Sequence, residues 1–240
     1  MSSSLLQVSG ISKRFGGLKA LSNVSLSVSA GEIVGLIGPN GAGKTTLFST
    51  LVGLHRPDSG AIKVGGRDLV GLKPHKIAAA GMIKTFQNVA LFLDSSVLDN
   101  VLTGGLMRHG VDDARKLARR CLERVGIAAI ADKLAHDLSF PERARVEVAR
   151  ALCTEPRILL LDEAMAALNH SEMDEFMTLL RQLRDEGLTL IIVEHHMRAI
   201  MSLCERLIVL NFGQMIASGT PSEIARNPAV VEAYLGRSAA

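Results

Sequence analysis

Short apolar runs recur along the chain and alternate with segments of helical periodicity. Near the N-terminus the runs 5–8, 24–28 and 33–37 predict β-strands. The second of these alternates apolar and polar residues, as expected of a half-exposed antiparallel strand, whereas the run 158–161 is continuously apolar. A run of that kind indicates a parallel strand that is buried on both faces.

The order of the remaining segments predicts a parallel sheet with helices outside it. Strand patterns alternate with helical patterns, which is typical of an α/β fold; strands are expected at 61–64, 82–86, 188–193 and 207–210, and helices at 74–80, 171–186 and about 196–203. Segment 97–154 is helical throughout and rich in Arg and Ala, so we interpret it as an inserted helical subdomain. The 240 residues then form a single domain, with 1–96 and 155–240 as its core.

One stretch after the strand pattern 33–37 carries a complete phosphate-binding motif, G-x-x-x-x-G-K-[ST]. Its glycines let backbone N–H groups converge on phosphate oxygens, Lys44 adds a positive charge at the β- and γ-phosphates, and Thr45 offers a hydroxyl to Mg²⁺. The helix that follows directs its positive dipole end to the same place. The stretch therefore predicts a nucleoside triphosphate site, formed by Gly38, Pro39, Asn40, Gly41, Ala42, Gly43, Lys44, Thr45 and Thr46.

Composition and charge exclude several other classes of protein. No apolar run reaches the length that a bilayer requires, and no basic segment followed by an apolar stretch opens the chain, so we expect a cytoplasmic protein. The formal net charge of +3 comes without Lys/Arg blocks and Trp is absent, which argues against nucleic acid as a partner. The 3 cysteines are too scattered for a metal cluster and are best read as packing residues.

Polar residues follow the apolar strands where ligands bind in open α/β sheets. Asp162 and Glu163 close the run 158–161, so Asp162 can hold Mg²⁺ while Glu163 polarises the water that attacks the γ-phosphate. An ordinary solvated strand end is the alternative for this pair. His195 follows the next apolar strand and could hydrogen-bond the γ-phosphate. Gln87 could contact Mg²⁺ and the attacking water, although a lone glutamine or histidine is more often structural.

Taken in order, these elements resemble the ATP-binding-cassette (ABC) ATPase family over nearly the whole chain. The phosphate loop corresponds to its Walker A motif, 158–163 to Walker B with the catalytic Glu163, Gln87 to the Q-loop and His195 to the switch histidine. The resemblance implies ATP and Mg²⁺ as cofactors and a P-loop NTPase fold of the ABC type: a RecA-like parallel core, an N-terminal antiparallel β subdomain and a helical insertion. Phe15 matches the family's adenine-stacking aromatic residue, with a core phenylalanine as the alternative.

Three stretches, 15–18, 85–88 and 229–236, look like the ATPase subunits of branched-chain amino-acid importers, with urea and lipopolysaccharide exporters as neighbouring branches. The resemblance implies four kinds of partner or location: a second ATPase subunit, transmembrane permeases, an external solute-binding protein that acts indirectly, and a peripheral position on the inner face of the membrane. Gln87 and the helical subdomain would face the permease. Two other classes stay open, a soluble non-transport cassette and an ATP-binding subunit that barely hydrolyses.

The family signature is altered in this chain. It reads LSFPERAR over 138–145, with Pro141 in place of glycine and Arg143 in place of glutamine. In the family this segment contacts the γ-phosphate held by the other subunit of a head-to-tail dimer, and Ser139 retains the hydroxyl for that contact. Proline has no N–H to donate, but it suits the first turn of a helix. We therefore expect the fold to survive, and we expect a heterodimer with a partner whose signature is intact. Ala164 and Ala167 also depart from the family's proline and glycine.

Overall fold

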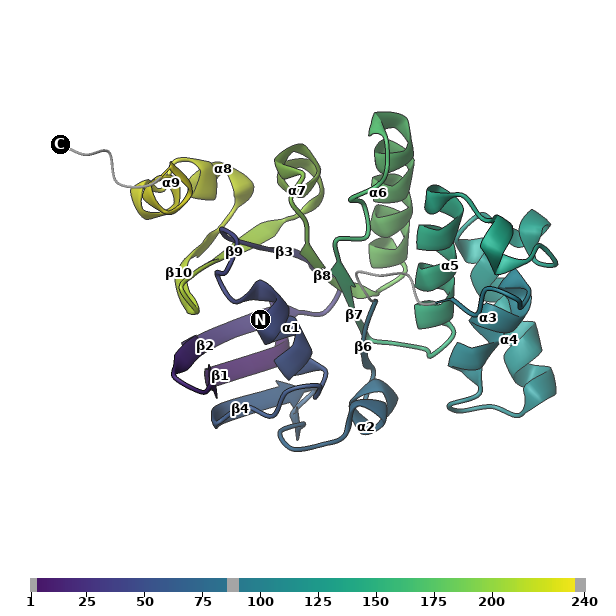
Figure 1. Ribbon diagram of the computed structural model, residues 1–240, viewed down its shortest axis with the longest axis horizontal. Coiled ribbons are helices and arrows are strands. Elements are labelled where there is room, and N and C mark those ends of the chain that lie inside the picture. The colour runs from purple at the N-terminus through teal and green to yellow at the C-terminus, as the bar shows by residue number, and fades with distance from the viewer. Residues whose placement is uncertain (1–3, 86–90, 236–240) are drawn as a thin grey trace.

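The computed structural model describes residues 4–85 and 91–235, which form two β-sheets with helices around them (Figure 1). The larger sheet has six strands in the order β10-β9-β3-β8-β7-β6. Its strands are β3 (Ile33–Ile37), β6 (Met82–Lys84), β7 (Ile158–Asp162), β8 (Thr189–Val193), β9 (Arg206–Asn211) and β10 (Gln214–Gly219). All neighbouring strands are parallel except β10, which pairs antiparallel with β9.

The central strands are buried on both faces, as their apolar runs predict. Every residue of β3, β7 and β8 is buried. Alternate residues point to two different cores: Leu159 and Leu161 belong to one, and Ile158 and Leu160 to the other. This arrangement confirms the parallel core, and it brings the carboxyl ends of β3, β7 and β8 to one edge of the sheet.

The smaller sheet is antiparallel, in the order β2-β1-β4-β5. Its strands are β1 (Ser4–Phe15), β2 (Leu18–Ser29), β4 (Ser59–Val64) and β5 (Arg67–Asp68). β1 and β2 extend well beyond the predicted runs 5–8 and 24–28. Register shifts, including one between Val8 and Ile11, interrupt the apolar alternation, so that the pattern ends before the pairing does.

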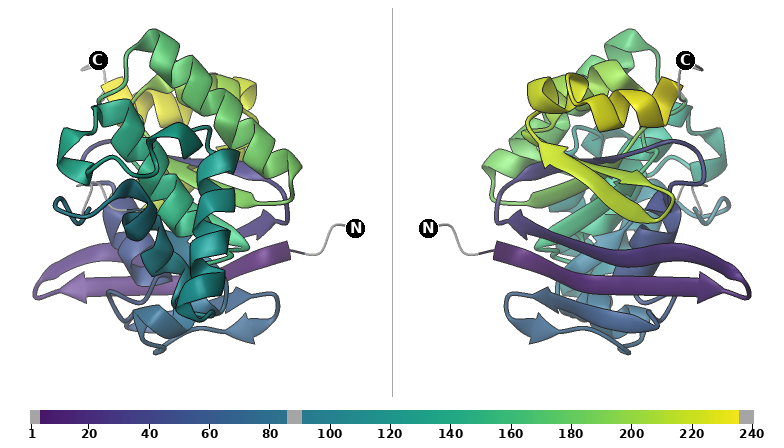
Figure 2. Two further views of the ribbon diagram at one scale, coloured as in Figure 1. Left: turned by 90° about the vertical axis from the view of Figure 1, so that its right-hand side faces the viewer. Right: turned by 90° about the vertical axis from the view of Figure 1, so that its left-hand side faces the viewer.

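Helices cover the central sheet on both sides. Helix α1 (Lys44–Leu51) packs between the two sheets through Leu47, Phe48 and Leu51. The opposite face is covered by α6 (His170–Asp185) and α7 (Met197–Leu203), which contribute to the second core. Figure 2 shows the antiparallel sheet and the C-terminal helices on one side of the molecule. The shorter α2 (Pro74–Ala79) follows β5.

Three helices of segment 97–154 pack together beside α6 (Figures 1 and 2). They are α3 (Val97–Gly105), α4 (Val111–Arg124) and α5 (Phe140–Leu152). Ser96 caps α3 by accepting a hydrogen bond from the N–H of Asp99 at 3.0 Å. Cys121 and Cys153 are buried between these helices and Cys204 is buried beside α7, all three as free thiols. The cysteines are thus packing residues, as expected.

Three C-terminal elements have no counterpart among the sequence predictions: β10, α8 (Pro221–Ala225) and α9 (Pro228–Leu235). They are short and half-exposed, and hence carry little periodicity. The predicted strand 82–86 ends at Lys84 in β6, and its last residue, Phe86, lies outside the described residues. Among the helices that the structure describes, none has the length and apolarity needed to cross a membrane.

Candidate functional site

The phosphate loop connects β3 to α1 under strict steric constraints. Gly38 has φ of 150°, and a Cβ atom there would lie 2.1 Å from the carbonyl oxygen of Leu210. Gly43 has φ of 102°, and its Cβ would lie 2.8 Å from the carbonyl oxygen of Ala20. Both positions thus exclude any side chain, because neighbouring strands approach the loop too closely. The glycine spacing of the motif serves this packing as well as phosphate binding.

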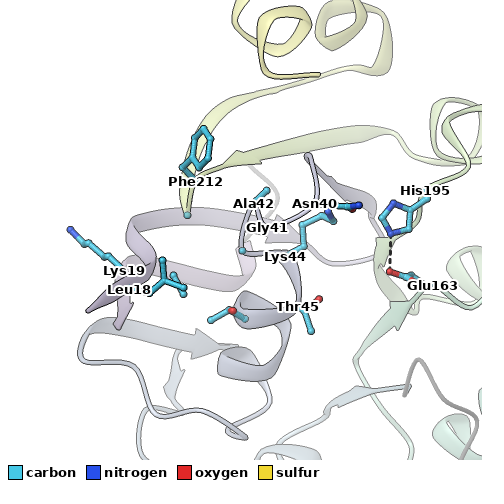
Figure 3. A pocket seen from close by; sticks show the side chains of 14 residues that line it. Leu18, Lys19, Asn40, Gly41, Ala42, Lys44, Thr45, Glu163, His195 and Phe212 are labelled. Carbon is cyan, nitrogen blue, oxygen red and sulfur yellow. Dashed lines mark hydrogen bonds and ion pairs between the residues drawn. The ribbon is translucent and has the colours of Figure 1, made fainter. Parts of the chain in front are cut away.

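A cavity of about 600 Å³ opens in front of the loop (Figure 3). Sequence reasoning missed five of its lining residues, which come from β2 and from the β9–β10 turn. Hydrogen bonds join the β9–β10 turn to the phosphate loop and to β2. Gly213 N–H donates to the Ala42 carbonyl at 2.9 Å, and Ser22 N–H donates to the Gly213 carbonyl at 2.8 Å. The cavity is lined by Leu18, Lys19, Ala20, Asn40, Gly41, Ala42, Gly43, Lys44, Thr45, Thr46, Glu163, His195, Phe212 and Gly213.

The side chain of Lys44 is hydrogen-bonded to the phosphate loop itself. Its ammonium donates hydrogen bonds to the carbonyl oxygens of Gly38 at 2.7 Å and Pro39 at 3.1 Å. Burial lowers the pKa of Lys44, while the nearby carboxylates of Glu163 and Asp162 raise it. The ammonium therefore lies within the electrostatic reach of both carboxylates.

Asp162 ends β7 as a buried carboxylate, and its Oδ2 lies 2.8 Å from Nζ of Lys84 on the adjacent strand β6. The donors available for a metal here are oxygens, the Asp162 carboxylate and the Thr45 hydroxyl. Hard oxygen donors and a small number of protein ligands suit Mg²⁺ that is also held by nucleotide phosphates. The chemistry of these residues therefore fits Mg²⁺, and Thr45 and Asp162 are the residues that would hold it.

Glu163 and His195 meet across the carboxyl ends of β7 and β8. Nε2 of His195 lies 2.8 Å from Oε1 of Glu163 (Figure 3). Glu163 has φ of 55°, in the left-handed region that residues other than glycine seldom occupy. Such backbone strain persists where surrounding contacts enforce it, and it is common at active sites. The sequence prediction that both side chains surface at one sheet edge is confirmed, although the left-handed turn was not foreseen.

For two other predicted residues the structure does not test the predicted role. Gln87 lies outside the described residues, so its role stays a prediction. Phe15 ends β1, where its ring packs edge-on against His55 with a centroid distance of 5.1 Å. Lys13 Nζ lies 5.4 Å from the same ring. The described lining residues of the cavity include Leu18 but not Phe15, so adenine stacking by Phe15 also stays a prediction.

The segment 138–145, which the sequence analysis interprets as an altered signature, includes the start of α5 and is tightly capped. Ser139 is the N-cap residue, and its N–H and hydroxyl both donate to Oε2 of Glu142, at 2.7 and 2.9 Å. Lys133 Nζ lies 3.1 Å from the same carboxylate. Partial burial raises the pKa of Glu142, but the hydrogen bonds from Ser139 and Lys133 outweigh this and leave the pKa below its ordinary value. Glu142 is therefore ionised at neutral pH, and it engages the hydroxyl that the family uses for phosphate.

Pro141 and Arg143 occupy this first turn without disturbing it. Pro141 lies in the first turn of α5, as expected of a residue without an N–H. Arg143 folds back along the preceding backbone, donating from Nε to the Leu138 carbonyl at 3.0 Å and from Nη2 to the His136 carbonyl at 3.2 Å. The expectation that the fold tolerates these substitutions holds in the structure, with Val146, Ala149 and Leu152 buried along α5.

Glu194, next to His195, is a further buried acid that sequence reasoning missed. Its side chain has Oε1 2.6 Å from the N–H of Met165, and it is 3% exposed. Burial raises the pKa of Glu194 to about 7, while hydrogen bonds from Met165 and His195 lower it. No local pattern marks this residue, because its partner lies in the loop after β7.

A pH dependence of stability follows from Glu194. Because its pKa is about 7 in the folded protein and 4.5 ordinarily, the folded state binds more protons than the unfolded state between those values. The free energy of unfolding should therefore fall as pH rises through this window, by up to about 3 kcal/mol. Glu194→Gln cannot ionise and should lack this decline. Urea unfolding across the window checks it, and parallel curves for the two proteins would contradict it.

Comparison with known proteins places this fold and site in one class. A family model described as ABC transporter matches residues 21–166, and one described as Branched-chain amino acid ATP-binding cassette transporter matches residues 214–240. The first match alone covers more than half of the chain. The chain belongs to the ABC transporter family, and it is accordingly an ATP-binding protein and an ATPase.

Particular relatives are similar over their full length. The chain is 40% identical to the high-affinity branched-chain amino acid transport ATP-binding protein BraF of Pseudomonas aeruginosa and 41% identical to LivG of Escherichia coli, covering 99% of this chain and 100% of each relative. It is 37% identical to the lipopolysaccharide export system ATP-binding protein LptB of Haemophilus influenzae, covering 97% of this chain and 98% of that protein.

Solved structures agree. A nucleotide-free ATP-binding cassette from an ABC transporter superposes with a TM-score of 0.90 at 28% identity, covering 98% of this chain and 100% of that one. The dimeric bacterial cassette MJ0796 gives a TM-score of 0.80 at 27% identity, covering 90% of this chain and 98% of that one. The predicted ABC fold is thereby confirmed.

Proposed function

We propose that this chain is the ATPase subunit of a membrane importer for branched-chain amino acids or similar small solutes. The observation that carries the proposal is the match of residues 214–240 to the branched-chain model, together with full-length similarity to BraF and LivG. Lipopolysaccharide export relatives are 37–38% identical, slightly below the amino-acid transport relatives at 40–42%. The solute would be selected by proteins other than this one.

The partners follow from this assignment. We expect a second ATPase subunit, transmembrane permeases and, indirectly, an external solute-binding protein, with this chain on the inner face of the membrane. Gln87 and the helices α3–α5 would transmit the nucleotide state to the permeases. Nucleic acid is not among the partners that we propose.

The residues that we propose for the chain's own half of the nucleotide site have distinct roles. The phosphate loop would cradle the phosphates, with Lys44 at the β- and γ-phosphates and the dipole of α1 adding positive potential. Mg²⁺, when bound through Thr45 and Asp162, would neutralise charge on the phosphates. Glu163 would accept a proton from the attacking water, and His195 would hold Glu163 at 2.8 Å and hydrogen-bond the γ-phosphate.

The other half, which this chain would present to its partner's nucleotide, is altered. Pro141 removes a donor and Glu142 engages Ser139, so we infer a heterodimer in which the partner supplies the intact signature. One nucleotide site would then hydrolyse ATP and the other would mainly hold it. The same observation favours a second candidate, a subunit that binds ATP but barely hydrolyses it. The Glu163–His195 contact supports hydrolysis instead.

Reconstitution of the full transporter in proteoliposomes tests the proposal. We expect uptake of radiolabelled leucine that requires ATP and stops in Lys44→Ala, because loss of the ammonium removes the charge at the β- and γ-phosphates. ATP turnover should rise when the permeases and solute-loaded binding protein are present. If the rate of ATP hydrolysis did not change when permeases or any of the small solutes tested were added, a role in import would be contradicted.

A further inference from the structure

Two loops that carry the proposed hydrolytic residues are tied together by three contacts. Glu163 N–H donates to the Val193 carbonyl at 2.8 Å, and His195 Nε2 lies 2.8 Å from Glu163 Oε1. The third tie is the hydrogen bond from Met165 N–H to Oε1 of Glu194 at 2.6 Å. The loop after β7 is thus fixed to the end of β8 on both sides of the strained residue Glu163.

The three contacts restrain a strained backbone conformation at Glu163. A glutamate with φ of 55° relaxes toward ordinary backbone values unless its neighbours prevent it. The Val193 carbonyl restrains the loop at Glu163 itself, and Glu194 restrains it two residues later at Met165. Because Met165 is completely buried, its N–H would lose a partner that water cannot replace if Glu194 lacked an acceptor.

An acidic side chain in the position of Glu194 lowers the stability of the fold. Its side chain is 3% exposed, and Oε2 has no hydrogen-bond partner among the described residues. The charged or titratable groups that face it are Glu163, whose charge opposes ionisation, and His195, whose charge favours it. A buried, incompletely satisfied acid detracts from stability, so its retention points to a role at the site beside it.

We propose that Glu194 is a positioning residue for ATP hydrolysis, whose carboxyl holds the loop after β7 against the end of β8 and so keeps Glu163 in contact with His195. The proposal rests on the proposed function, because it concerns the water-activating step assigned to Glu163. Glu194 is not among the described residues that line the nucleotide cavity. Its loss should therefore affect the rate of hydrolysis rather than ATP binding.

The test compares three variants in the assembled transporter. Glu194→Met removes the acceptor at nearly constant volume, Glu194→Gln keeps a carbonyl oxygen for the Met165 N–H, and Glu32→Gln is the control. Glu32 is a half-buried glutamate that also accepts a backbone hydrogen bond, from Ser29 at 2.8 Å, but it precedes β3 at the opposite edge of the sheet. The readouts are kcat, KM for ATP, and hydrogen exchange of the amides at 163–168 by mass spectrometry.

We expect Glu194→Met to lower kcat by about tenfold or more, to leave KM for ATP within about twofold, and to speed amide exchange at 163–168. Glu194→Gln should retain most of kcat and the slow exchange. Glu32→Gln should change neither. If Glu194→Met does not fold, Glu194→Leu takes its place, and a Met165 amide that exchanges freely in the unaltered protein would also overturn the proposal.

The outcomes separate this inference from the proposed function. Unchanged kcat and exchange in Glu194→Met, or an equal loss in the Met and Gln variants, would overturn the positioning role. If Glu163→Gln still abolished turnover in that case, the ATPase assignment would stand. A fully assembled transporter that never hydrolyses ATP would instead refute the proposed function.

Discussion

Replacing Glu163 by glutamine should lower ATP turnover of the assembled transporter by about 100-fold or more and leave ATP binding intact. Glutamine keeps the size of the side chain and an oxygen for His195, but it cannot accept a proton from water. Hydrogen-bonding residues around the nucleotide are unchanged, so the ATP-bound dimer should accumulate. Steady-state phosphate release and size-exclusion chromatography with ATP measure the two effects.

A control in the same segment separates chemistry from stability. Glu172, in the first turn of α6, accepts a hydrogen bond from Asn169 N–H at 2.8 Å and belongs to that helix's capping box. Glu172→Gln should weaken the cap by at most about 1 kcal/mol and leave turnover near its original value. If Glu163→Gln hydrolyses ATP as fast as the unaltered chain, Glu163 is not the base. That result would favour the second candidate function, a regulatory subunit that binds ATP but barely hydrolyses it.

The second large effect is expected at the altered signature. In Pro141→Gly/Glu142→Gln, glycine restores a backbone N–H and glutamine removes the carboxylate that accepts both donors of Ser139. A phosphate approaching Ser139 would no longer meet an anion. Restored charge-assisted hydrogen bonds are each worth about 1.5–3 kcal/mol, so ATP turnover in the assembled transporter should rise by about tenfold.

Helix α8 offers a matched control for this change. There Thr220 donates from N–H and hydroxyl to Oε2 of Glu223 at 2.7 and 2.9 Å, and Pro221 follows in the first turn. Glu223→Gln removes the same kind of cap far from the signature and should leave turnover unchanged. If the signature double variant also leaves turnover unchanged, the signature is not limiting and the heterodimer loses its main support.

The sequence predicts best what is encoded locally. The spacing from Gly38 to Thr46 and the apolar run of β7 each define an element without reference to distant residues, and both lie where expected. The antiparallel strands β1 and β2 are longer than predicted because their register shifts break the alternation on which strand prediction depends. Phe15 shows the same limit, because the ring contact with His55 follows from pairing between β1 and its neighbours.

Two interactions that the sequence analysis missed differ in how local their signal is. The capping box of Ser139 and Glu142 has a local S-x-x-E signature and could have been recognised from the sequence. Glu194 could not, because its contact with Met165 depends on the parallel pairing of β7 with β8 and on a left-handed turn at Glu163. Long-range register and strained backbone are the features that a single sequence reveals least.

We infer that this chain carries the hydrolysing nucleotide site, completed by a partner whose signature is intact. Photolabelling of the assembled transporter with an azido-ATP analogue, trapped after one turnover by orthovanadate, tests it most directly. We expect the trapped nucleotide to label this chain, and Glu163→Gln to prevent the trapping. Label found only on the other ATPase subunit, with this chain unlabelled, would show that the hydrolysing site lies in that subunit instead.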